Sequence, residues 1–191
     1  MGTTAFTPKL NKTKKEFRFI ILGPQNSGKT TFLLNLVYPE YRIPAIPTKT
    51  FNTDTITYKK YSINFLDMTE EEWQKQSEKE RINILKDRHA LLFFVDLSKI
   101  SNYNYQNEIE KLFATFLKLD INKSFPFVIV ANKRDLVSSV ETKLLSRVFK
   151  LDNIKDRKYY LITASAKEGQ GIDECLNFLI NSLELEKIII L

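Results

Sequence analysis

Six short apolar runs alternate with longer segments of mixed polarity, and this alternation constrains the fold more than any other feature of the chain. The runs are rich in Phe, Ile and Val, whereas the segments between them repeat apolar residues with helical period. Strands and helices that alternate in this way build a largely parallel sheet with helices on both faces. The predicted strands cover residues 17–22, 51–58, 61–67, 90–96, 127–131 and 159–163.

The second and third predicted strands are separated only by Lys59 and Lys60. Because two residues cannot hold a helical crossover, these strands are expected to form an antiparallel hairpin within an otherwise parallel sheet. With 191 residues, of which 43% are hydrophobic, the chain can fill one compact core. The predicted helices cover residues 28–37, 78–88, 103–119, 140–149 and 172–185. The expected organisation is a flexible basic arm (1–15), one domain (16–187) and a short apolar tail (188–191).

A phosphate-binding motif directly follows the first predicted strand. The segment from Gly23 to Thr30 fits the spacing G-x-x-x-x-G-K-[ST]. Glycine lets such a loop turn sharply and bring backbone N–H groups close to phosphate oxygens, and the next helix directs its positive end at the same anion. Lys29 would neutralise the β- and γ-phosphates, and the Thr30 hydroxyl would ligate Mg²⁺. An ordinary strand-to-helix turn is the plain alternative, which the complete motif disfavours. The predicted nucleotide contacts of this segment are Gly23, Gln25, Asn26, Ser27, Gly28, Lys29, Thr30 and Thr31.

A second polar motif, of the form N-K-x-D, follows the fifth predicted strand. The Asp135 carboxylate can accept hydrogen bonds from the ring N–H and the exocyclic amino group of guanine, whereas adenine offers no such pair of donors. Lys133 would lay its alkyl stem over the purine, and Asn132 would brace the loop. Four polar residues after a strand are often only a solvated turn. The motif S-A-K (Ser165, Ala166 and Lys167) follows the last predicted strand, however, as it does in GTPases, so the order of the motifs favours guanine.

The first switch is where the sequence resembles Arf-like small GTPases most specifically. The stretch from Ile46 to Asn52 is similar to the family's I-P-T-x-G-F-N, and the resemblance extends over residues 17–185. It implies the three-layer P-loop NTPase fold and binding of GTP or GDP with Mg²⁺. It also implies that Thr48 ligates the metal together with Thr30, and that Asp67 does so through water. Thr50 replaces the glycine of the pattern, which is expected to restrict the switch backbone.

The second switch departs from the family pattern. Where Arf-type proteins have D-V-G-G-Q, this chain keeps Asp67 but has Glu70 at the glycine position and Glu71 at the glutamine position. A carboxylate cannot donate a hydrogen bond to phosphoryl oxygens as an amide does. The resemblance makes Glu71, at the glutamine position, and Lys29 the candidate catalytic residues. Because Glu71 is a carboxylate, hydrolysis of GTP is expected to be slow or absent.

These observations are consistent with three functions. The chain is either a regulatory GTP/GDP switch with slow hydrolysis, or a nucleotide-bound, non-cycling subunit of a larger assembly. The two glutamates and the long polar stretch around Trp73 favour the second of these. The third, a P-loop kinase or ATPase, is disfavoured by the guanine motif.

The expected partners are protein effectors or a host complex, which would contact the switch region and the apolar tail. The net charge of +6 and the lysines before the first strand allow weak membrane contact, but they are too sparse for nucleic acid. Myristoylation at Gly2 is disfavoured by Phe6. The single cysteine, Cys175, is interpreted as core packing in an intracellular protein, cytoplasmic or ciliary, or else organelle-associated within a complex.

Overall fold

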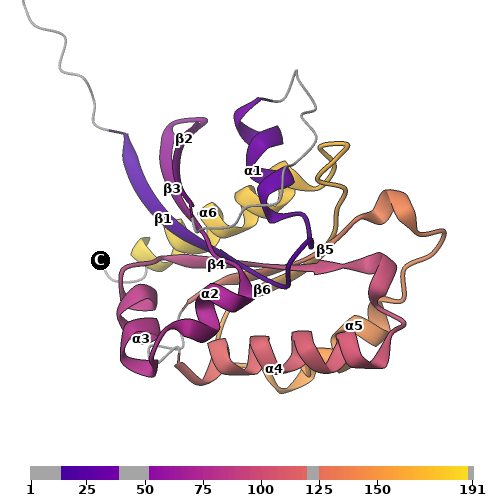
Figure 1. Ribbon diagram of the computed structural model, residues 1–191. Helices are drawn as coiled ribbons and strands as arrows, with labels where there is room; N and C mark the ends of the chain where they lie inside the picture. Colours follow the sequence, from indigo (N-terminus) through magenta and orange to yellow (C-terminus); the bar gives the residue numbers. More distant parts are fainter. Residues whose placement is uncertain (1–13, 39–51, 120–124, 189–191) are drawn as a thin grey trace, which may run out of the picture.

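The sheet has the predicted architecture. The computed structural model describes residues 14–38, 52–119 and 125–188, and within these ranges six strands form one sheet in the order β2-β3-β1-β4-β5-β6 (Figure 1). Every neighbouring pair is parallel except β2 and β3, which are antiparallel and joined by a turn at Lys59 and Lys60. The α/β prediction with one hairpin is therefore confirmed. The strands are β1 (Lys15–Leu22), β2 (Asn52–Tyr58), β3 (Tyr61–Asp67), β4 (Ala90–Asp96), β5 (Phe127–Asn132) and β6 (Tyr159–Thr163).

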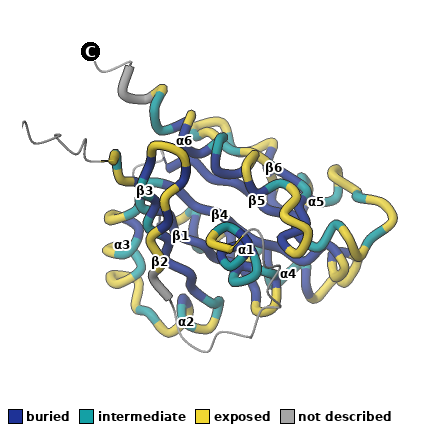
Figure 2. The backbone as a smooth tube through the Cα atoms, turned by 90° about the horizontal axis from the view of Figure 1, so that it is seen from above, coloured by how far each residue is buried: buried dark blue, intermediate teal, exposed yellow. Residues whose placement is uncertain are grey.

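Helices cover both faces of this sheet, and each face has its own apolar cluster. Phe32 of α1 and Leu176 of α6 belong to one cluster, whereas Trp73 of α2 and Phe113 of α4 belong to the other. Figure 2 shows the resulting buried strands between helices whose outer sides are exposed. The helices are α1 (Lys29–Val37), α2 (Glu70–Lys75), α3 (Glu78–Lys86), α4 (Tyr103–Leu119), α5 (Thr142–Val148) and α6 (Ile172–Ile188), with short 3-10 turns η1 (Leu97–Lys99), η2 (Arg134–Leu136) and η3 (Leu151–Asn153).

The central strands are apolar at nearly every position because both of their faces are covered. All seven residues of β4 are buried, and alternate side chains enter opposite clusters: Phe93 packs on the α4 side and Phe94 on the α1 side. Phe94 meets Phe32 of α1 edge to face, with ring centroids 5.2 Å apart. This two-sided burial holds β1, β4 and β5 rigidly, so the loops at their carboxyl ends start from fixed positions.

The sequence prediction omits one helix and misplaces several boundaries. No helix is predicted in the polar stretch around Trp73, yet residues 70–75 form α2. Of these six residues only Trp73 is buried, so the stretch carries no apolar period by which a helix would be recognised. The helix predicted at 78–88 ends at Lys86, the one predicted at 140–149 spans Thr142–Val148, and α6 continues to Ile188.

Two further sequence expectations can be compared with the structure. Cys175 is fully buried within the α6 cluster, which confirms it as core packing. The structure begins β1 at Lys15, the last residue of the predicted arm. None of the described helices is long and apolar enough to cross a membrane. Residues 1–13 of the predicted arm and 189–191 of the apolar tail lie outside the described residues.

Candidate nucleotide-binding site

The predicted motifs meet at the carboxyl ends of the parallel strands. The strand order reverses direction between β1 and β4, and in open α/β sheets ligands bind in the crevice beyond such a point. The loop after β1 begins with Gly23, whose φ of 146° is one that side-chain-bearing residues rarely adopt. A Cβ atom there would lie 2.3 Å from the Phe94 carbonyl oxygen of β4. The loop can therefore leave the strand at this point only as glycine.

Asn132, at the end of β5, joins the phosphate motif to the guanine motifs. Its Nδ2 donates to the Ser27 carbonyl at 2.8 Å, and its Oδ1 accepts from the Ala166 backbone N–H at 2.8 Å. The neighbouring Gly28 has a φ of 97°, and a Cβ atom there would lie 2.0 Å from Asn132 Nδ2. Gly28 is thus required both for its backbone conformation and for the approach of Asn132.

Lys29 is held inside the loop that it belongs to. Its Nζ donates to the carbonyl oxygens of Gly23 and Pro24, each at 2.8 Å, and the residue is only 5% exposed. Burial lowers the pKa of Lys29 to about 8, although the charges of Asp67 and Glu72 oppose the shift. The ammonium is therefore still largely protonated at neutral pH, and an ammonium has three donors, of which these carbonyls use two.

The predicted metal ligands that can be described lie side by side. Thr30 Oγ1 donates to Asp67 Oδ2 at 3.2 Å, across the gap between α1 and the end of β3. Asp67 is 4% exposed, and burial raises the pKa of its carboxyl, with Lys29 opposing. Its other oxygen, Oδ1, is buried and makes no hydrogen bond within the described ranges.

This donor set fits Mg²⁺. The ion prefers oxygen ligands and is commonly held by one or two protein oxygens together with phosphates and water. A hydroxyl and a buried carboxylate with an unsatisfied oxygen meet that requirement. The third predicted ligand, Thr48, lies outside the described residues. Among the part of the chain that the structure describes, no cluster of three His, Cys, Asp or Glu side chains could hold a metal by itself.

On the base side, two predicted residues are fixed by side chains from other parts of the chain. Lys133 has a left-handed backbone with a φ of 64°, and its Nζ lies 2.7 Å from Asp96 Oδ2. Ser165 Oγ donates to Asp135 Oδ1 at 2.7 Å, which orients the exposed Asp135 carboxylate. The N-K-x-D and S-A-K motifs therefore form one unit.

Sequence reasoning missed two residues of this region. Asp96 ends β4, is 2% exposed, and holds Lys133 while also accepting from the Ser98 backbone N–H. Asn35 lies on the buried side of α1, where its Nδ2 donates to the Ala166 carbonyl. Each is a polar residue on a buried face, and that is the signal that would have identified it.

The remaining predicted contacts lie around the loop. Gln25 and Asn26 are exposed at its tip, Ser27 is fully buried, and Thr31 on α1 is half-buried. Ser27 Oγ donates to the Pro24 carbonyl at 2.8 Å, which closes the loop on itself. Lys167 is exposed beyond Ala166.

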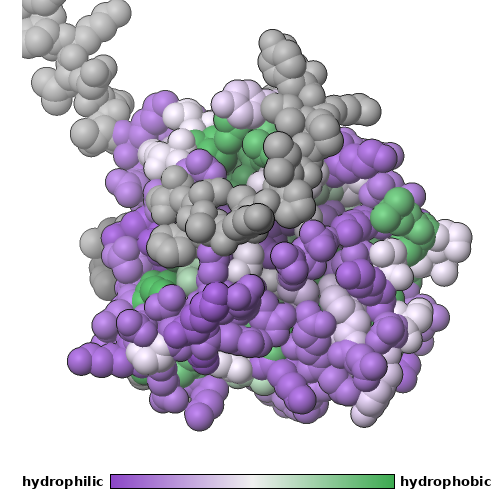
Figure 3. Space-filling model, in the orientation of Figure 1, coloured by the Kyte–Doolittle hydropathy of each residue, from purple (hydrophilic) through white to green (hydrophobic). Residues whose placement is uncertain are grey.

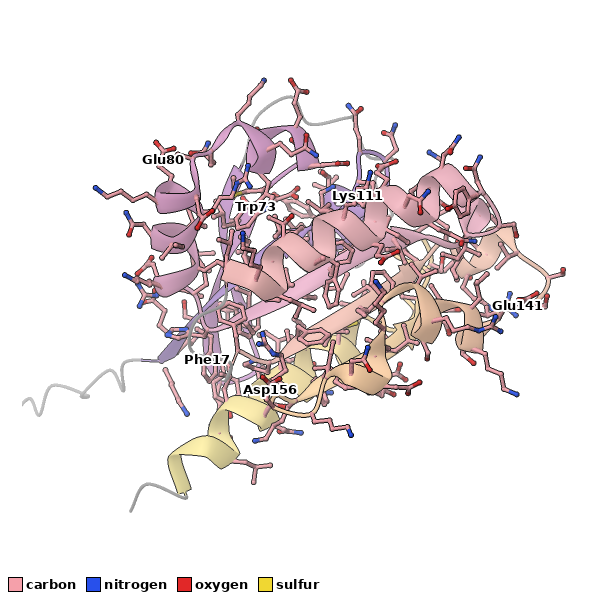
Figure 4. All side chains as sticks on the ribbon, turned by 90° about the horizontal axis from the view of Figure 1, so that it is seen from below. Phe17, Trp73, Glu80, Lys111, Glu141 and Asp156 are labelled. Carbon is pink, nitrogen blue, oxygen red and sulfur yellow. The ribbon has the colours of Figure 1, made fainter. Side chains whose placement is uncertain are left out.

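The second switch forms an anchored helix. Thr69 and Glu72 form a capping box, and Trp73 is fully buried on the α4 side of the sheet (Figure 4). Arg81 of α3 stacks on the Trp73 ring at 5.7 Å and donates from Nε to the Trp73 carbonyl at 2.8 Å. Glu71 points outward: its side chain is 76% exposed and pairs with Lys75 at 2.6 Å.

Glu70 and Glu71 both line a hollow beside the phosphate loop. This hollow, of about 600 Å³, is open to solvent and is also lined by Pro24, Gln25 and Asn26, by other residues of α2, and by the start of α4. Figure 3 shows that hydrophilic side chains dominate the face carrying α2. Glu70 accepts from Gln74 Nε2 at 2.6 Å, and Glu108 of α4 lines the same hollow.

Strand order, glycine loop, buried lysine and the Thr30–Asp67 pair together define a P-loop nucleotide-binding protein. The model of the ADP-ribosylation factor (Arf) family matches residues 3–183. The chain therefore belongs to the Arf family and is an Arf-like small GTPase of the Ras superfamily, as the first-switch motif predicted.

Individual relatives support this assignment. The chain is 27% identical over 184 residues to ADP-ribosylation factor-like protein 2 of Dictyostelium discoideum, with 96% of each chain covered. It is 28% identical over 185 residues to ADP-ribosylation factor-like protein 2 of Arabidopsis thaliana, again with 96% of each covered. The Arl6 BBS3 small GTPase from Trypanosoma brucei, solved with the nucleotide analogue GppNp, superposes with a TM-score of 0.69 over 88% of this chain and 97% of its own. At 20% identity that structure supports the fold.

Proposed function

We propose that this chain binds GTP and GDP with Mg²⁺ and acts as an Arf-like regulatory switch whose intrinsic hydrolysis is slow. The observation that carries the proposal is the orientation of Glu71, which occupies the family's glutamine position but pairs with Lys75 at the surface. The described residues of the nucleotide site, in contrast, are suited to bind a guanine nucleotide with Mg²⁺.

Each motif has a role in this proposal. Lys29 would compensate phosphate charge, while Thr30, Asp67 and Thr48 would hold the metal, Asp67 through water. The guanine base would lie against Lys133 and be recognised by Asp135, and the backbone at Ala166 would line the pocket. Bound Mg²⁺ would supply charge neutralisation at the phosphates. Asn132 and Asp96 would act as positioning residues, since each holds another member of the site.

Slow hydrolysis follows from two side chains. Glu71 cannot donate a hydrogen bond to a phosphoryl oxygen, and its exposed side chain pairs with Lys75 of the same helix. Glu70 faces the phosphate side, where a carboxylate about 4 Å from one phosphate charge would be repelled by about 4 kcal/mol at an effective dielectric of 20. Neither residue therefore substitutes for the glycine and glutamine of the family pattern.

The second candidate is a nucleotide-bound subunit that does not cycle. The anchoring of α2 favours it, because the capping box and the buried Trp73 oppose the rearrangement on which a switch depends. Under either candidate, the partners would be protein effectors or a host complex that contacts the α2 region or the apolar tail. Any membrane contact would be weak. The proposed compartment is cytoplasmic or ciliary, or an organelle-associated complex.

Single-turnover hydrolysis of preloaded GTP tests the proposal. The wild type and Glu71→Gln are expected to be slow, and Glu70→Gly with Glu71→Gln is expected to gain more than the sum of the single changes, because the two positions act together. A fast wild type, or full recovery from Glu71→Gln alone, would refute the reasoning. The nucleotide that copurifies, and whether it exchanges within minutes or stays for days, distinguishes the switch from the locked subunit.

A further inference from the structure

A tyrosine in the first turn of α4 contacts the residue that holds the base-side lysine. The Tyr105 hydroxyl accepts a hydrogen bond from the Asp96 backbone N–H at 2.7 Å. Asp96 is the last residue of β4, and its Oδ2 lies 2.7 Å from Lys133 Nζ. The helix α4 is therefore connected to the predicted guanine pocket through a single intermediate residue.

The Asp96 N–H lies beyond the point where β1 pairs with β4. That pairing ends at Phe93, before Asp96 is reached. Asp96 is only 2% exposed, so water cannot replace a lost partner. A buried N–H group without an acceptor is unfavourable, and the Tyr105 hydroxyl supplies the acceptor here. The end of β4 is thus held by a side chain of α4.

Tyr105 and Asp96 are themselves fixed by neighbouring groups. The Tyr105 backbone N–H donates to Asn102 Oδ1 at 3.1 Å, as in a helix N-cap, and Tyr105 is 7% exposed within the apolar cluster on the α4 side. The backbone N–H and the Oγ of Ser98 donate to Asp96 Oδ1 at 3.0 and 2.6 Å. With its backbone and one carboxylate oxygen held in this way, Asp96 directs Oδ2 at Lys133.

We propose that Tyr105 is a positioning residue for guanine-nucleotide binding, which fixes the end of β4 so that Asp96 keeps the Lys133 side chain against the base. This inference rests on the proposed function. A lysine side chain that is not held samples many rotamers, and a ligand binds more weakly by the fraction of time in which its pocket is not assembled. Removing the Tyr105 hydroxyl should therefore weaken nucleotide binding, although Tyr105 is not one of the predicted nucleotide contacts.

The test compares the Kd for GDP of full-chain variants in excess Mg²⁺ by titration calorimetry. Tyr105→Phe keeps the ring and removes only the hydroxyl, and it is expected to raise the Kd about fivefold, the factor that corresponds to the net free energy of one hydrogen bond. Tyr159→Phe is the matched control. Its hydroxyl donates to the Leu151 carbonyl at 3.5 Å from the first residue of β6, at the end of the strand opposite the site, and its loss should leave the Kd within about twofold of the wild type.

A double-mutant cycle with Lys133 separates positioning from general stabilisation. Lys133→Met keeps an apolar stem but removes the ammonium that Asp96 holds. In that background Tyr105→Phe should change the Kd for GDP by less than about twofold, because both substitutions interrupt the same chain of contacts. A merely structural role of Tyr105 would instead weaken binding by the same factor in both backgrounds. Tyr105→Leu removes the same acceptor with a different apolar side chain and should repeat both results.

The outcomes distinguish this inference from the function on which it rests. If the wild type binds GDP but Tyr105→Phe leaves the Kd unchanged, or if its effect persists in full beside Lys133→Met, the positioning role of Tyr105 is overturned and the proposed function stands. Failure of the wild type to bind any guanine nucleotide would overturn the proposed function and this inference with it. Melting temperatures of the variants, measured beside the affinities, show that each one is folded.

Discussion

Asn132→Asp tests whether the hydrogen bonds of Asn132, and not the size of its side chain, link the phosphate loop to the guanine motifs. The substitution keeps the shape and the oxygen that accepts from Ala166, but it replaces the Nδ2 donor with an oxygen that faces the Ser27 carbonyl 2.8 Å away. The residue is 2% exposed, so water cannot compensate. Losing this hydrogen bond costs about 1 kcal/mol, and leaving buried acceptors unsatisfied costs about 1 to 3 kcal/mol more. The free energy of unfolding should therefore fall by about 2 to 4 kcal/mol.

Urea denaturation at several pH values measures this loss and tests its cause. A protonated carboxyl at position 132 can donate to the Ser27 carbonyl, so its pKa should be higher in the folded than in the unfolded state. The deficit should accordingly be greatest at neutral pH and shrink as the pH falls through that raised pKa. Asn153→Asp makes the same change at an exposed position and should leave stability within about 0.5 kcal/mol. If Asn132→Asp were equally silent, the role of Asn132 as the link would be refuted.

Two further substitutions examine the anchored helix and the choice of base. Trp73→Ala should lower the free energy of unfolding by about 3 to 5 kcal/mol, because it empties a fully buried site. Gln74→Ala, on the exposed side of α2, should lower it little in the same denaturation experiment, and equal effects of the two substitutions would contradict the anchoring of α2. Asp135→Asn should weaken GTP and GDP binding by about 1.5 to 3 kcal/mol in titration calorimetry and improve binding of xanthine nucleotides, and equal affinity of the unmodified protein for ATP and GTP would contradict the guanine assignment.

The backbone framework could be predicted from the sequence because its causes are local. The strands at 61–67, 90–96 and 159–163 have the predicted bounds, and so does the helix at 103–119. In each, side chains a few positions apart set the period, and burial on both faces of the sheet makes the central strands apolar throughout. The phosphate loop belongs with them, since its glycines and lysine act within eight consecutive residues.

The missing helix shows the limit of local signals. One support of α2 is the capping box of Thr69 and Glu72, which is visible in the sequence as T-x-x-E. The other is Trp73, which contacts Arg81 of α3 and belongs to the apolar cluster that α4 also joins. A single buried residue gives no period. Only the packing of Trp73 decided that this polar stretch folds as a helix.

How the site is held together was decided by tertiary structure. Asn132 meets Ser27 across 105 positions of sequence, and Lys133 meets Asp96 across 37. These contacts exist because parallel strands bring their carboxyl ends to one edge of the sheet, where a side chain's partner is set by strand order instead of sequence distance. The sequence by itself therefore determined which chemical groups the pocket contains, and the fold determined which of them touch.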